Sequence, residues 1–116
     1  MQPRETEIFD DPLAQQIRLE FDSALDGGAS VYTAAEAILQ KYVARIHDPD
    51  CGPVILYALA SLQLQHGVIS SPIRKRALTW INSGEALERW SGTAPETVSA
   101  RKRVEQELRS KLLAMG

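Results

Sequence analysis

One stretch of the chain, residues 52–67, has apolar side chains on nearly every side of the helix that their spacing predicts. Val54 and Ala58 fall within one arc of that helix, whereas Leu56 and Ala60 fall on the opposite side. A helix that is apolar around most of its circumference has to be covered by neighbours from several directions. The pattern therefore predicts a buried central helix.

The ends of this stretch carry residues typical of helix ends. Pro53 suits the first helical turn, and Gly67 suits the left-handed residue that follows a helix. A strand over residues 54–59 is the alternative, but the length of the stretch and its Ala, Gln and Leu content favour a helix. Polar residues from Ser61 to His66 interrupt the stretch, which makes it too short to cross a bilayer.

Four further amphipathic segments predict helices around the central one, each introduced by a capping residue or an early proline. They cover residues 12 to about 26, 30 to about 47, 70 to about 83 and 93 to about 115, with a short helical turn at 85–90. A capping box at residues 33–36 is an alternative start for the second helix, and Asp50 is the expected cap of the central helix.

Each predicted helix has an apolar face that we expect to contact the core. These faces contain Leu13, Ile17, Phe21, Ala24 and Leu25; Val31, Ala35, Ile38, Leu39, Tyr42, Val43 and Ile46; Ile73, Ala77, Trp80 and Ile81; and Val98, Val104, Leu108, Leu112 and Met115. We expect Phe21, Tyr42, Tyr57, Trp80 and Trp90 to be at least partly buried.

No segment shows the two-residue alternation of a strand. The predicted fold is all-α: a single compact orthogonal helical bundle of five longer helices plus one short helical turn around a central buried helix. Residues 1–116 form one domain, with residues 1–7 expected to be frayed.

Composition indicates an ordinary globular protein, because 44% of the residues are hydrophobic and 24% are charged. The single cysteine excludes an internal disulfide, and the N-terminus has no signal-peptide pattern. We therefore expect a soluble cytoplasmic protein with no membrane segment.

The net charge of −2 is unevenly distributed, since residues 1–50 carry −6 and residues 51–116 carry +4. The acidic candidates for a partner-binding surface are Asp10, Asp11, Glu20, Asp22 and Asp26, with Glu20 and Asp22 expected to face solvent. A merely solvated helix face is the alternative for these residues. If they are functional, they would bind a basic protein partner.

Two basic triplets stand in the second half of the chain: Arg74, Lys75 and Arg76, and Arg101, Lys102 and Arg103. If the last helix packs beside the helix at residues 70–83, the triplets could form one patch for phosphates. Against nucleic-acid binding, each triplet is spread around its helix rather than gathered on one face, and no aromatic residue is interleaved for base stacking.

Catalytic and metal-binding signals are weak. Cys51 near a helix start, with His47 as base, is the one candidate for nucleophilic catalysis; a semi-buried structural cysteine is the alternative. The Asp48–Gly52 segment begins like a calcium loop but has Leu59 where a carboxylate is needed. No nucleotide, zinc or hydrolase motif is present, so we expect no cofactor and no metal.

Three segments resemble a small uncharacterised bacterial family. They are Ile8-Phe9-Asp10-Asp11 with Ala14, Arg18, Glu20 and Phe21; Asp48-Pro49-Asp50 with Gly52, Pro53, Leu59 and Ala60; and Arg76-Ala77-Leu78 followed by Ile81-Asn82-Ser83-Gly84-Glu85, Leu87, Glu88, Arg89 and Trp90. Members usually carry Trp-Gly-x-Gly before the Ile-Phe pair, where this chain has Arg4-Glu5-Thr6-Glu7. The family is similar in scale to toxin-immunity proteins and has no assigned activity, so the resemblance implies no catalytic residues.

These observations favour a non-catalytic bacterial protein that binds another protein through its acidic face, as an immunity or adaptor protein does. A small enzyme using Cys51 and a weak nucleic-acid binder using the basic triplets are the alternatives. The length of the last helix also makes a homodimer a reasonable expectation.

Overall fold

The computed structural model describes residues 11–48, 51–84 and 95–115, with the backbone alone for residues 95–101 and 115. Every regular element in these ranges is helical, and the all-α bundle is confirmed. The elements are α2 (Pro12–Asp26), α3 (Val31–Lys41), the 3-10 turn η1 (Val43–Arg45), α4 (Gly52–Gln65), α5 (Ser71–Ser83) and α7 (Pro95–Met115).

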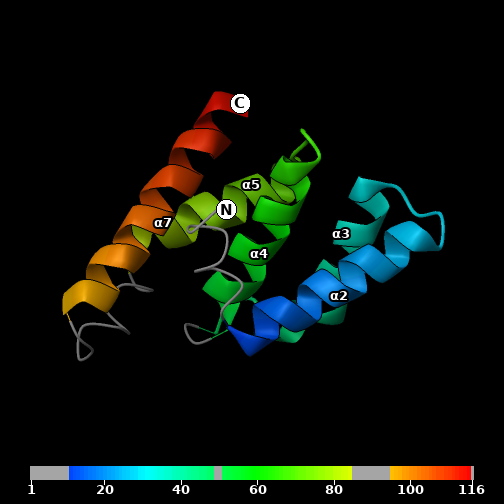
Figure 1. Cartoon of the computed structure of the whole chain (residues 1–116), viewed down its shortest axis with the longest axis horizontal. Coiled ribbons are helices and arrows are strands. Elements are labelled where there is room, and N and C mark those ends of the chain that lie inside the picture. Colours follow the sequence, from blue (N-terminus) through cyan, green and yellow to red (C-terminus); the bar gives the residue numbers. More distant parts are fainter. Residues whose placement is uncertain (1–10, 49–50, 85–94, 116) are drawn as a thin grey trace.

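Helix α4 is the centre of the bundle, as the sequence predicts. It contacts α2, α3, α5 and α7, and Figure 1 shows it between the α2–α3 pair on one side and α7 on the other. Its buried residues run almost without interruption from Gly52 to Gln63. Burial on all sides explains why its apolar residues are not confined to one stripe.

Local signals fix the ends of the helices. Asp11 Oδ1 accepts a hydrogen bond from Leu13 N at 2.8 Å, and α2 then begins at Pro12 as predicted. Ser30 Oγ accepts from Thr33 N at 3.1 Å, which selects Ser30 rather than Thr33 as the cap of α3. Gly67 follows α4 in the left-handed region, with φ of 77°.

The predicted second helix is too long. Helix α3 ends at Lys41, and the chain tightens into η1, in which Arg45 N donates to Tyr42 O at 2.8 Å. Because a 3-10 turn rotates each residue further than an α-helix does, Val43 leaves the inward arc and is 51% exposed. Tyr42 and Ile46 remain buried on either side of it.

A close approach at the start of α4 requires glycine. A Cβ atom on Gly52 would clash with Ile46 O and would lie 2.7 Å from Cζ2 of Trp80. The indole Nε1 of Trp80 donates to the same Ile46 oxygen at 3.3 Å. Gly52 therefore lets α5 pack against the turn that precedes α4. The cap residue of α4 is Cys51, whose side chain makes no capping bond, and Asp50 lies outside the described residues.

The burial predicted for the aromatic residues is confirmed for those that the structure describes. Phe21, Tyr42 and Tyr57 are buried and Trp80 is half-buried. Trp90 and the predicted turn at residues 85–90 lie outside the described residues. On α7, Val104, Leu108 and Leu112 are buried as expected, whereas the side chains of Val98 and Met115 are not described.

Candidate protein-binding surface

The five acidic candidates do not form one face. Asp10 lies outside the described residues, and Asp11 is occupied as the cap of α2. Asp22 and Asp26 are exposed and, being four residues apart, lie about 40° from each other around the helix. Glu20 lies about 160° from Asp22, on the opposite flank of α2.

Glu20 faces α3 rather than solvent, which corrects the sequence expectation. Its side chain is 19% exposed, and its Oε2 accepts hydrogen bonds from Gln16 Nε2 at 2.9 Å and Tyr42 OH at 3.0 Å. The ammonium of Lys41 lies 3.0 Å from the same oxygen and 5.5 Å from the centre of the Tyr42 ring. Helix α3 therefore neutralises this carboxylate.

The hydrogen bonds to Glu20 set its protonation. Burial alone would raise the pKa of Glu20, but the hydrogen bonds from Gln16, Lys41 and Tyr42 outweigh it, and the pKa lies below its ordinary value. Burial and the Glu20 contact raise the pKa of Tyr42, so its hydroxyl stays a donor. Glu20 is thus a structural carboxylate that joins α2 to α3.

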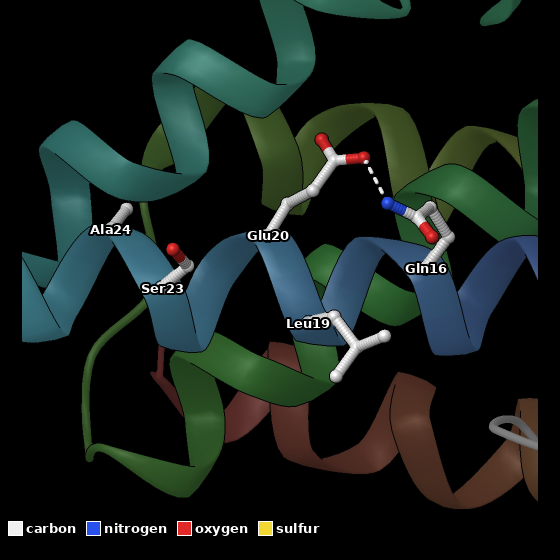
Figure 2. Close-up of a pocket in the computed structure, with 5 residues that line it drawn as sticks. All are labelled: Gln16, Leu19, Glu20, Ser23 and Ala24. Carbon is white, nitrogen blue, oxygen red and sulfur yellow. Dashed lines mark hydrogen bonds between the residues drawn. The ribbon is translucent and has the colours of Figure 1, made fainter.

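Between the two flanks lies Leu19, which at 65% exposure is the most exposed large hydrophobic side chain of the described residues. In Figure 2 Gln16 and Glu20 point to one side of α2, and Leu19 points away from them. We call Leu19, Asp22, Ser23 and Asp26 the outer face of α2. An open hollow of about 470 Å³ adjoins it, lined by Gln16, Leu19, Glu20, Ser23 and Ala24.

The positions of the two basic triplets give little support to the hypothesis that they form one patch for phosphates. Helices α5 and α7 do pack together, but Arg74 is half-buried, and its Nε donates to Leu112 O at 2.9 Å. Leu112 is nine residues, or roughly 13 Å, along α7 from Arg103. Lys75, Arg76, Lys102 and Arg103 are exposed, and the side chain of Arg101 is not described.

Cys51 is half-buried, and its sulfur accepts a hydrogen bond from Arg45 Nη2 at 3.0 Å. The proposed base, His47, is exposed. Of the residues that the structure describes, the polar partner of the thiol is thus a guanidinium, which cannot act as a general base.

A buried polar contact between two helices was missed by sequence reasoning. Tyr57 OH on α4 donates to Glu105 Oε2 on α7 at 2.6 Å, and Glu105 is only 3% exposed. Burial raises the pKa of Glu105, and the hydrogen bond from Tyr57 opposes that shift. A sequence signal existed, because Glu105 lies about 20° from Leu112 around the helix, within the apolar stripe.

Gln63 is a second buried polar residue that the apolar pattern of α4 conceals. It is fully buried, and its Oε1 accepts from Ser70 N at 3.0 Å, which ties the end of α4 to the start of α5. Ser70 Oγ also donates to this oxygen, at 3.3 Å, and makes no capping hydrogen bond to α5.

Comparison with protein-family models, curated proteins and solved structures gives no match to this chain. Among the described residues, no three His, Cys, Asp or Glu side chains are grouped closely enough to hold a metal ion. No described helix has the length and hydrophobicity needed to cross a membrane. No relative or solved structure therefore bears on the function of this chain.

Proposed function

We propose that this protein is a non-catalytic protein-binding module whose outer face of α2 binds a basic partner protein. The observation that carries the proposal is the position of Leu19: an exposed leucine on a regular helix, beside an open hollow and on the same face as the exposed Asp22 and Asp26. An immunity- or adaptor-like role in a bacterium is part of this proposal, and the acidic first half of the chain is what supports it.

A single exposed leucine is common on protein surfaces, so Leu19 alone would carry little weight. The residues around Leu19 are what make it a candidate contact for a partner protein. Asp22 is three residues from Leu19 and lies about 60° away on the helix, so both can contact the same partner element. An apolar anchor with charged groups at its rim is the usual anatomy of a transient interface.

The charges define the chemistry of the partner. Because Lys41 neutralises Glu20, the negative charge available for binding comes from Asp22 and Asp26. A partner that fits has lysine or arginine beside an apolar side chain. Such charges accelerate association, and salt weakens their effect.

Site-specific photocrosslinking in the native host tests the proposal. A crosslinking amino acid at position 19 should capture one defined protein, whereas the same group at Val43, which is exposed by 51% on η1, should not. The captured protein, once purified, should bind the full chain with an affinity that falls as salt is added.

Charge reversal sharpens the test. Asp22→Lys with Asp26→Lys should weaken binding of that protein at least tenfold, whereas Glu36→Lys on the exposed surface of α3 should change it little. Equal capture from positions 19 and 43, or an affinity unchanged by the Asp22/Asp26 reversal, would contradict a binding role for this face.

A further inference from the structure

The Tyr57–Glu105 contact places a carboxyl group in a buried interface between α4 and α7. Glu105 is 3% exposed and Tyr57 is 4% exposed, and the hydroxyl donates to Glu105 Oε2 at 2.6 Å. Val104, Leu108 and Leu112 are buried on the same helix, which packs against α5 as well as α4. A carboxylate in such surroundings is costly unless a cation or several donors compensate it.

Two described arginines of the packed helices are bonded to groups other than Glu105, and the described cations Lys75, Arg76, Arg103 and Lys111 are exposed. On α5, Arg74 Nε donates to Leu112 O, and on α7, Arg109 Nε donates to Asn82 Oδ1 at 3.2 Å. Lys102 is exposed, and the side chain of Arg101 is not described. Within the described part of the chain, the hydrogen-bond partner of the Glu105 carboxyl is the hydroxyl of Tyr57 on α4.

Tyr57 itself does not change charge in the range where a carboxyl titrates. Burial, followed by the neighbouring Glu105, raises the pKa of Tyr57 far above its ordinary range. The tyrosine is therefore a constant donor, and Glu105 is the one member of the pair whose charge varies.

We propose that the Tyr57–Glu105 contact makes the attachment of α7 to the bundle depend on protons: the neutral carboxyl holds α7 against α4, and its ionisation loosens α7. Loosening exposes the apolar stripe of α7 together with the surface of α4 around Tyr57. A local opening of this kind can occur while α2, α3 and α4 stay packed.

The direction follows from proton linkage. Because burial raises the pKa of Glu105 when α7 is attached, the attached state binds the proton more tightly than the detached state does. The extra stability is complete below the ordinary glutamate pKa, about 4.3, and is lost as the pH rises through the raised value. Attachment of α7 is therefore tightest in mild acid.

Hydrogen exchange of the full chain, followed by mass spectrometry across a pH series, measures this opening. After correction for the intrinsic exchange rate, the opening constant of α7 should rise with pH by up to tenfold per pH unit, the limit for one released proton. The opening constant of α2, in the same sample, should not follow that slope.

Glu105→Gln keeps the shape of the neutral carboxyl and cannot ionise, so its α7 opening constant should be independent of pH. The matched control Glu36→Gln, on the exposed surface of α3, should keep the wild-type slope. Circular dichroism establishes that both variants fold. If Glu105→Gln does not fold, the wild-type comparison of α7 with α2 still decides. A flat wild-type profile for α7, or a Glu105→Gln variant with the wild-type slope, would overturn the proposal.

Discussion

Two glutamates in this molecule each accept a hydrogen bond from a tyrosine, yet their pKa values are shifted in opposite directions. Glu20 is bonded by Tyr42 at the edge of the α2–α3 pair, and its pKa is lowered. Glu105 is bonded by Tyr57 inside the α4–α7 interface, and its pKa is raised. The tyrosine is common to both, so the difference comes from the surroundings.

The surroundings differ in donors and in access to water. Glu20 also has Gln16 and Lys41, and its side chain keeps 19% of its exposure. Glu105 has Tyr57 as its described partner and is almost fully buried. Several donors outweigh the burial of the first carboxylate, whereas one donor does not outweigh the burial of the second.

We expect the largest loss of stability from a substitution in α4, because both regions pack against this helix. Leu59, fully buried on α4, is part of the core between them. Leu59→Ala should lower the free energy of unfolding by about 2–5 kcal/mol, the range for a cavity left by a leucine. Urea denaturation measures it, and a loss well under about 1 kcal/mol would mean that α4 is not the core.

We expect the second largest loss of stability from removing the hydroxyl of Tyr57, which bonds the buried Glu105. Tyr57→Phe leaves the Glu105 carboxyl without its described donor, and a buried polar group in that state costs about 1–3 kcal/mol. Thermal and urea unfolding near neutral pH check this. Stability equal to wild type would indicate that water or another group compensates the carboxyl.

Replacing tyrosine by phenylalanine in the Tyr42–Glu20 pair should lower the free energy of unfolding less. Tyr42→Phe leaves Glu20 with Gln16 and Lys41 and with partial access to water, so we expect a loss below about 1 kcal/mol. The informative quantity is the ratio of the two losses under one set of conditions. A larger loss for Tyr42→Phe than for Tyr57→Phe would reverse the comparison.

The smallest effect concerns the pH dependence contributed by Glu20. Because its pKa is lowered in the folded state, its stabilisation is present above the ordinary glutamate value and is lost as the pH falls through the folded value. Glu20→Gln should remove this contribution, at most about 1 kcal/mol for a partly exposed pair, and should reduce sensitivity to salt. Unfolding measured from pH 3 to 7 tests it, and an acid profile identical to wild type would contradict it.

The helices were predictable because each boundary depends on neighbouring residues. Asp11 with Pro12, Ser30 and Gly67 all act within one helical turn, and the sequence places α2 with both of its ends. The end of α3 was not predictable, because the change to η1 leaves the apolar spacing of Tyr42, Val43 and Ile46 looking continuous.

The candidate site was only partly predictable. Sequence alone grouped Glu20 with Asp22 because both are acidic residues of one helix, although helix geometry puts them about 160° apart. The contacts of Glu20 with Lys41 and Tyr42 depend on how α3 packs against α2 and could not be read from the sequence. Leu19 was not singled out, although helix geometry puts it about 160° from both Ile17 and Phe21 and therefore outside the apolar face of its helix. Glu105 lay within an apolar stripe, but its partner Tyr57 is 48 residues away in the chain and is brought to it by the fold.

Direct titration of both carboxyl groups tests the contrast most simply. In the uniformly ¹³C-labelled full chain, the side-chain carboxyl shifts of Glu20 and Glu105 can be followed together from pH 3 to 9. The account predicts a midpoint for Glu20 below the ordinary glutamate value and a midpoint for Glu105 above it. Equal midpoints, or a Glu105 midpoint below that of Glu20, would contradict it.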